Sequence, residues 1–170
     1  MSHAKNKVSW CLNKAKKELE EGGKHRGLVQ AEPDKEKALE HIKKAEHNLK
    51  GAINFNNTGF SDWSASAFFY SMYQCLLAIS AKFGYESGNQ ECTFALIHSL
   101  IEDGKIDFEK ELIDKLALLD AQKDKEKSTS IDIREDYQYG TKLSLEEKLY
   151  EELLALSQKV LSKTKEIIEE

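Results

Sequence analysis

The segment from Gln122 to Lys142 carries the side chains best suited to chemistry or recognition, and it shows neither a helical nor a strand period. Its first part, residues 122–130, is polar and charged, and we predict that it is a mobile insert. Its second part, residues 131–140, contains isoleucines and tyrosines that can anchor it against a core. Long irregular connections in compact domains are usually disordered or functional. We therefore expect the site in the ordered second part.

In that second part an arginine lies among tyrosines and acidic residues, and the candidates are Arg134, Asp136, Tyr137 and Tyr139. A guanidinium can pair with a phosphate, and a tyrosine ring can stack on a base. These residues are therefore candidates for binding a nucleotide or RNA. The neighbouring carboxylates of Asp132, Glu135 and Asp136 instead favour a structural ion pair that would repel a phosphate. Both roles of the arginine stay open.

Other candidates lie outside this segment. Lys24 and Arg26 flank His25 beside glycines, where cationic side chains and free backbone N–H groups could receive a phosphate. An ordinary solvated loop is the simpler interpretation of that cluster. His98 borders an apolar helical stripe, where a packed histidine is more common than a catalytic one. No set of residues has the spacing of metal ligands, so we expect neither a metal nor a cofactor.

The element that must position these residues is a helix from Ser61 to Gly84, which carries no charge between Asp62 and Lys82. Its apolar residues lie on two sides, so other helices or lipid must surround it. Its several serines are costly facing lipid, and no basic cluster flanks the run. We therefore predict a central core helix and no membrane segment. Ser61 is expected to cap its start, and Gly84 to end it.

Amphipathic helices are predicted on either side of this core, over residues 5–21, 34–57, 91–102, 107–121 and 144–170. The turn after Asn57 makes the second and third helices an antiparallel hairpin. Ser144 and Glu147 have the spacing of a capping box for the last helix. The predicted fold is one all-α domain over residues 1–170, an up-and-down antiparallel bundle of five to six helices. Residues 1–30 form an N-terminal helical extension, and residues 34–170 form the bundle.

Composition limits the choice of partners and compartment. A net charge of −5 and a pI of about 5.6 disfavour a protein that coats nucleic acid without specificity. The N-terminus has no pattern of a signal peptide. Cys11, Cys75 and Cys92 are odd in number and far apart, which predicts buried thiols rather than disulfides. We therefore expect a cytoplasmic protein.

Three pieces of the sequence form a recognisable set: the turn and aromatic helix at residues 59–73, the helix and turn at residues 95–98 and 102–107, and the segment Arg134–Tyr137. Together they resemble the HEPN domain proteins of bacteria and archaea (higher eukaryotes and prokaryotes nucleotide-binding). Their order and spacing carry the resemblance, which covers roughly residues 34–170. The N-terminal helix lies outside it.

The resemblance implies a helical bundle that often dimerises. Some members of the family are metal-independent ribonucleases, frequently toxins paired with a nucleotidyltransferase-type antitoxin, and these use an Arg-x4-6-His motif. This chain departs from the motif, because Tyr139 stands where the histidine would follow Arg134 and no histidine follows His98. A tyrosine with a pKa near ~10 is a poor proton-transfer group at neutral pH.

The favoured hypothesis is a HEPN-like module that binds a nucleotide, RNA or a partner protein without catalysis. The alternative is a metal-independent endoribonuclease that uses Arg134, Tyr139 and His98, as the toxin of a toxin–antitoxin pair. A third hypothesis is a structural dimerisation protein with no small ligand. The expected partners are a nucleotide or RNA, a nucleotidyltransferase-type protein and a second copy of the chain.

Overall fold

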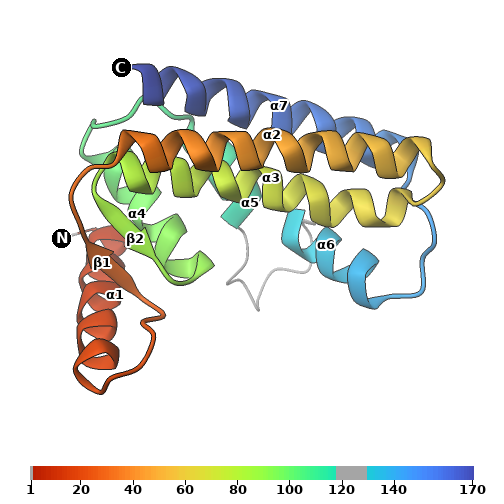
Figure 1. The fold of residues 1–170 in the computed structure, drawn as a ribbon. Coiled ribbons are helices and arrows are strands. Elements are labelled where there is room, and N and C mark those ends of the chain that lie inside the picture. Colours follow the sequence, from red (N-terminus) through yellow and green to blue (C-terminus); the bar gives the residue numbers. More distant parts are fainter. Residues whose placement is uncertain (1, 118–129) are drawn as a thin grey trace.

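The computed structural model describes residues 2–117 and 130–170 of the chain (Figure 1). The described residues form helices and one antiparallel pair of short strands, which confirms the prediction of an all-α fold. In chain order these are α1 (His3–Glu20), β1 (Leu28–Gln30), α2 (Lys35–Asn57), α3 (Ser61–Lys82), β2 (Tyr85–Ser87), α4 (Gln90–Glu102), α5 (Lys110–Ala117), α6 (Ser130–Tyr139) and α7 (Glu147–Glu169).

Helix α3 lies at the centre, as its uncharged sequence predicts. Its large side chains Phe68, Phe69, Met72, Leu76 and Ile79 are fully buried. Helices α2, α7, α6 and α4 all pack against it. In the described part of the chain no helix combines the length and apolarity needed to cross a membrane.

Helices α2 and α3 form the predicted antiparallel hairpin, and small residues let them lie close together (Figure 1). The Ser64 hydroxyl donates to the Ala52 carbonyl at 2.7 Å, and the Ser71 hydroxyl donates to the Ala45 carbonyl at 2.8 Å. Both alanines are completely buried. The hydroxyl groups of these two serines therefore have hydrogen-bond partners in the backbone of α2, which offsets the cost of burying them.

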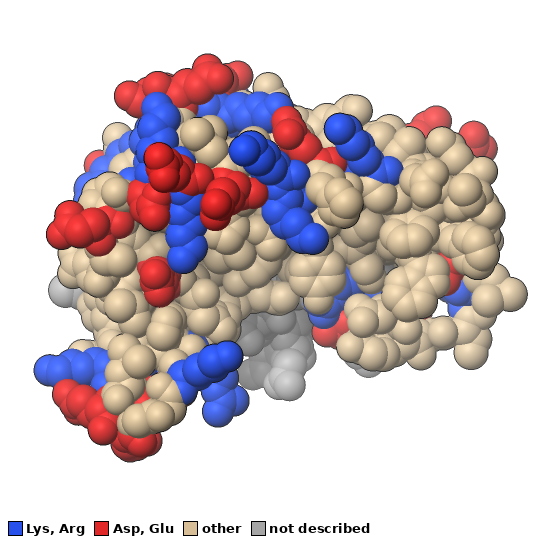
Figure 2. All heavy atoms as spheres, in the orientation of Figure 1, with Lys and Arg blue, Asp and Glu red and all other residues tan. Residues whose placement is uncertain are grey.

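The N-terminal extension joins the bundle through a small sheet that the sequence analysis did not foresee. Strand β1 pairs antiparallel with β2, from Leu28 opposite Ser87 to Gln30 opposite Tyr85. Gly84 permits this connection, since its φ is +74° and an added Cβ would lie 2.6 Å from the Ala31 carbonyl oxygen. Helix α1 projects from this end of the molecule (Figure 1), with basic side chains on its flanks and acidic ones at its tip (Figure 2).

Several local predictions are wrong. Residues 131–140 are not an irregular segment, because helix α6 occupies Ser130–Tyr139. The capping box at Ser144 does not form, because α7 begins at Glu147 after Glu146, with no side-chain cap. Ser61 does not cap α3, and its hydroxyl instead accepts from the Leu145 N–H at 2.9 Å. The predicted mobile insert and the end of the fifth helix lie mostly outside the described residues.

The prediction of three free thiols is wrong for two of them, because Cys11 of α1 and Cys92 of α4 form a disulfide. They are 81 residues apart in sequence, so spacing alone gave no sign that the fold brings them together. Cys75 is free and buried, and burial raises the pKa of its thiol to about 12. Disulfides persist mainly in oxidising compartments, so the cysteines no longer argue for the cytoplasm.

Reduction of the Cys11–Cys92 disulfide should destabilise the protein. The bond closes a long loop, and removing such a constraint costs about 2–4 kcal/mol of unfolding free energy. The measurement is thermal and denaturant unfolding with and without a thiol reductant. The double variant Cys11→Ala/Cys92→Ala is the matched control and should not respond to the reductant. An equal response in both proteins would contradict the disulfide.

Candidate functional site

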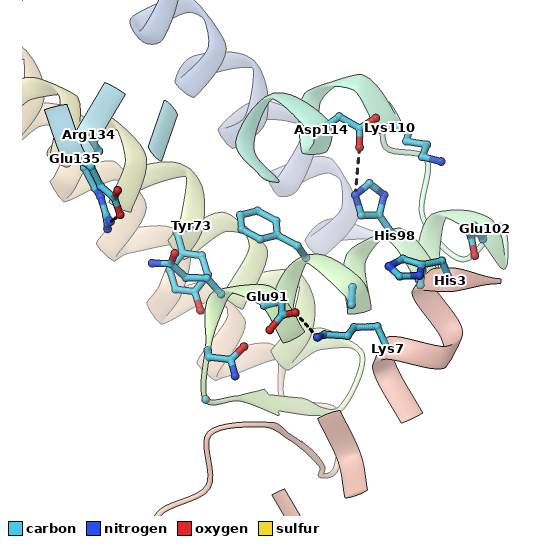
Figure 3. A pocket seen from close by; sticks show the side chains of 16 residues that line it. His3, Lys7, Tyr73, Glu91, His98, Glu102, Lys110, Asp114, Arg134 and Glu135 are labelled. Carbon is cyan, nitrogen blue, oxygen red and sulfur yellow. Dashed lines mark hydrogen bonds and ion pairs between the residues drawn. The ribbon is translucent and has the colours of Figure 1, made fainter. Parts of the chain in front are cut away.

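A cavity of about 1040 Å³ opens between α1, α4, α5 and α6, with Tyr73 of α3 in its wall (Figure 3). Two of the candidates from the sequence line it, Arg134 from α6 and His98 from α4. The sequence could not show whether the helix of His98 lies near Arg134. The fold brings both side chains to one cavity, although Figure 3 shows them at opposite ends of it.

The Arg134 side chain is only 11% exposed and lies against α3. Its Cζ is 4.9 Å from the centroid of the Phe69 ring, and Nη1 donates to the Tyr70 hydroxyl at 3.3 Å. Nη2 pairs with Glu135 Oε1 at 3.3 Å. Nε is buried and has no hydrogen-bond partner among the described residues. The guanidinium is thus held mainly by aromatic rings.

The ion pair between Arg134 and Glu135 is weak. The Glu135 side chain is 59% exposed, so water screens the carboxylate end of this ion pair. Asp136 is exposed and does not line the cavity. The side chain of Asp132 lies outside the described residues. A phosphate entering the cavity would therefore meet a cation whose described carboxylate partner is solvent-screened.

His98 is oriented by α5, because its Nε2 lies 3.3 Å from Asp114 Oδ1. Burial lowers the pKa of His98 below its usual 6.5, and Lys110 acts in the same direction, whereas Asp114 and Glu102 oppose the shift. The imidazole is therefore neutral at neutral pH. In the tautomer that donates Nε2–H to Asp114, the other ring nitrogen is left as an acceptor.

An aromatic wall connects the two ends of the cavity. The Tyr73 ring lies parallel to Phe69 at a centroid distance of 6.0 Å and tilted against Phe94 at 6.5 Å. The Tyr73 hydroxyl lies 3.1 Å from Thr93 Oγ1, and burial raises the pKa of Tyr73. Tyr73 and Phe94 have the helical spacing of core residues, so the sequence alone did not mark them as part of a site. The sequence analysis also missed Lys7, Asp114 and Lys110, which looked like ordinary surface charge.

The remaining candidates lie away from this cavity. Tyr139 is 77% exposed and follows Arg134 by five residues, about 140° further round the helix. Tyr137 is buried with Phe68 and Leu145 in a second core cluster, so it cannot stack on a base where it stands. Lys24 and Arg26 lie between α1 and β1, and neither side chain lines the cavity. The described residues hold no group of three or more metal-ligating side chains.

The HEPN domain family matches residues 38–167, about three quarters of the chain. The chain belongs to the HEPN family. No curated protein matches the sequence. The match spans α2 to α7, so it includes Arg134 and His98 but excludes α1 and β1 of this HEPN protein. Membership makes the chain a nucleotide- or RNA-related module in general terms.

The pKa of His98 in this HEPN chain should respond in opposite directions to two neighbouring substitutions. Asp114→Asn removes a carboxylate that raises the pKa, so the pKa should fall further; Lys110→Gln removes a cation and should raise it. NMR titration of the imidazole measures both. Since the pKa in the folded state lies below 6.5, the contribution of His98 to stability is fully present above pH 6.5 and is lost as the pH falls from 6.5 through the lowered pKa of the folded state. A value unchanged in both variants would contradict the described contacts.

Proposed function

We propose that this HEPN domain binds a nucleotide or the end of an RNA strand in the cavity between α1, α4, α5 and α6, without cleaving it. The observation that carries the proposal is the Arg134 guanidinium, which lines a cavity of about 1040 Å³ and pairs, among the described residues, with a carboxylate that water screens. Binding cavities for small ligands are commonly of about this size, with a few polar groups placed in a largely apolar wall.

Each end of the cavity would take a different part of the ligand. Arg134 would pair with a phosphate, because a guanidinium presents several N–H donors in a fixed plane that matches phosphate oxygens. The partly exposed Tyr73 ring would stack against a base. Lys110 also lines the cavity and adds positive charge near His98. A mononucleotide has both parts within one molecule.

The proposal that binding occurs without catalysis rests on distance and chemistry. In-line RNA cleavage needs a proton-transfer group within about 3 Å of the reacting oxygen, in reach of the cation that stabilises the phosphate. Tyr139 is exposed on another face of α6. His98 has a suitable chemistry but lies across the cavity from Arg134 (Figure 3).

A ribonuclease remains the second candidate, because His98 faces the same cavity and Asp114 orients its ring. Incubation of the purified protein with single-stranded RNA in the presence of a chelator tests it. Cleavage that disappears in both Arg134→Ala and His98→Gln would establish the ribonuclease and overturn binding without catalysis. Intact RNA at all times would support the binding module.

Substitutions at Arg134 and at its ion-pair partner Glu135 should change nucleotide affinity in opposite directions. Arg134→Ala removes a charge-assisted hydrogen bond worth about 1.5–3 kcal/mol, so the affinity for adenosine monophosphate should fall about 10- to 100-fold. Glu135→Gln removes the competing carboxylate and should tighten binding several-fold. Calorimetric titration at fixed low salt measures both affinities.

Controls separate a phosphate-binding arginine from a structural one. Lys148→Ala removes one positive charge from the exposed start of α7 and should leave nucleotide affinity unchanged. Arg134→Lys keeps the charge but loses the fork of donors, so its affinity should lie between those of the wild type and the alanine variant. If Glu135→Gln weakens binding or no nucleotide binds at all, the proposal is wrong and the structural dimerisation protein is favoured.

The homodimer, the nucleotidyltransferase-type partner and the cytoplasmic location stay predictions. The first is measured by the molar mass of the protein in solution. The second is measured by co-purification with a nucleotidyltransferase-type protein expressed from a neighbouring gene. The Cys11–Cys92 disulfide is the observation that weighs against a reducing cytoplasm.

A further inference from the structure

Helix α1 forms one wall of the cavity, although it lies outside the residues that match the HEPN family. His3, Ala4 and Lys7 reach the cavity from its first two turns. The disulfide at Cys11 and the ion pair of Lys5 with Asp103 at 2.5 Å fix the helix on α4. This added wall is therefore held in a defined position relative to the cavity.

One face of α1 carries a row of cationic and aromatic side chains that leads away from the cavity. We call this row the α1 stripe, and it consists of His3, Lys7, Trp10, Lys14 and Lys17. Their spacing of three and four residues places them on one side of the helix. From Lys7 to Lys17 the stripe is about 15 Å long, the length of about four stacked nucleotides.

The centre of the stripe is an exposed tryptophan between two lysines. Trp10 is 48% exposed, and the Nζ atoms of Lys7 and Lys14 lie 4.2 and 5.1 Å from a ring centroid of its side chain. Stacking of a base on an aromatic ring raises affinity about tenfold, whereas an exposed cation–π contact gives only a few-fold. A base can therefore displace Lys14 from the ring, and its ammonium group can then pair with a phosphate, whereas Lys7 also forms an ion pair with Glu91.

Positive charge is concentrated in the N-terminal residues of the chain, which favours the binding of a polyanion to α1. Residues 1–30 contain seven lysines and arginines and three glutamates, a net charge of +4, whereas the whole chain carries −5. The remaining residues therefore carry −9. Figure 2 shows basic side chains on both sides of the projecting N-terminal part of the molecule. A nucleic-acid strand that extends beyond the cavity would therefore be attracted more to α1 than to the acidic remainder of the chain.

We propose that the α1 stripe is a docking track for single-stranded RNA, along which the strand continues after its end enters the cavity. Trp10 stacks on one base, and Lys14 and Lys17 pair with the phosphates beyond it. This inference rests on the proposed function for the placement of the RNA end. It adds that the affinity increases with strand length and depends on residues that the HEPN match does not include.

The two tryptophans of the chain allow a direct test. The variant Trp63→Phe leaves Trp10 as the sole tryptophan, and the variant Trp10→Phe leaves Trp63, which is 50% exposed on α3. Oligouridylate of about 6 nucleotides should quench the fluorescence of Trp10 and leave that of Trp63 unchanged. Uridine monophosphate should quench neither, because it fills the cavity alone. Quenching of both tryptophans, or of neither, would overturn the docking track.

Charge removal gives an independent measurement. Lys14→Gln/Lys17→Gln should weaken oligouridylate binding about tenfold and reduce the slope of log affinity against log salt by about 1 to 1.5. Its affinity for uridine monophosphate should not change. The matched control is Lys50→Gln/Lys148→Gln, which removes the same charge from exposed positions on α2 and α7. Equal losses in the two double variants would overturn the track, since net charge alone would then explain the effect.

The failure of the inference and that of the proposed function give different results. If uridine monophosphate binds through Arg134 but longer strands bind no tighter, the track is wrong and the cavity stands. If oligouridylate quenches Trp10 while Arg134→Ala binds every ligand as the wild type does, the proposed function is wrong, and with it the placement of the RNA end. If polyglutamate binds the stripe as tightly as oligouridylate, the partner is an acidic protein segment, and the assignment to RNA is overturned.

Discussion

The close contact between α2 and α3 is the interaction on which the rest of the structure depends, because it lets a nearly uncharged helix be buried over most of its surface. Ser64 and Ser71 donate to carbonyl groups of α2 beside fully buried alanines. With those donors satisfied, the large side chains of α3 are free to face α7, α4 and α6. The second, smaller core cluster of Phe68, Tyr137 and Leu153 then holds α6 and α7 at the far end of α3.

The cavity lies outside the packed core, where helix α1 is attached to the bundle. The fully buried residues of α1 are small (Ala4, Cys11 and Ala15), and its larger Val8 and Leu12 are only partly buried, so its apolar packing is limited. A disulfide, a two-stranded sheet and ion pairs supplement that packing and attach it to α4. Space remains between α1 and the bundle, and apart from the aromatic wall most side chains that line it are polar or charged. The cavity is therefore partly polar because its outer wall, α1, is attached by a disulfide, a sheet and ion pairs in addition to apolar packing.

The sequence predicted the core better than the site. The uncharged run from Asp62 to Lys82 and the turn before it were enough to predict the central helix and its hairpin. Helix α6 was missed because its ten residues have no clear apolar stripe, and the contact of Tyr137 with α3 and α7 is a tertiary effect. The disulfide and the sheet were missed for the same reason, since each joins segments far apart in sequence. Of the candidate residues, only Arg134 and His98 line the cavity.

Arg134 links the stability of α6 to the occupancy of the cavity. Its guanidinium lies over Phe69 and bonds to Tyr70, so it helps to hold α6 on α3. The same group lines the cavity and is the cation that an anionic ligand would meet there. A ligand that binds only the docked arrangement of α6 must stabilise that arrangement by mass action. The structural role of this arginine and its proposed phosphate-binding role are therefore compatible, because the guanidinium that contacts the aromatic rings also lines the cavity.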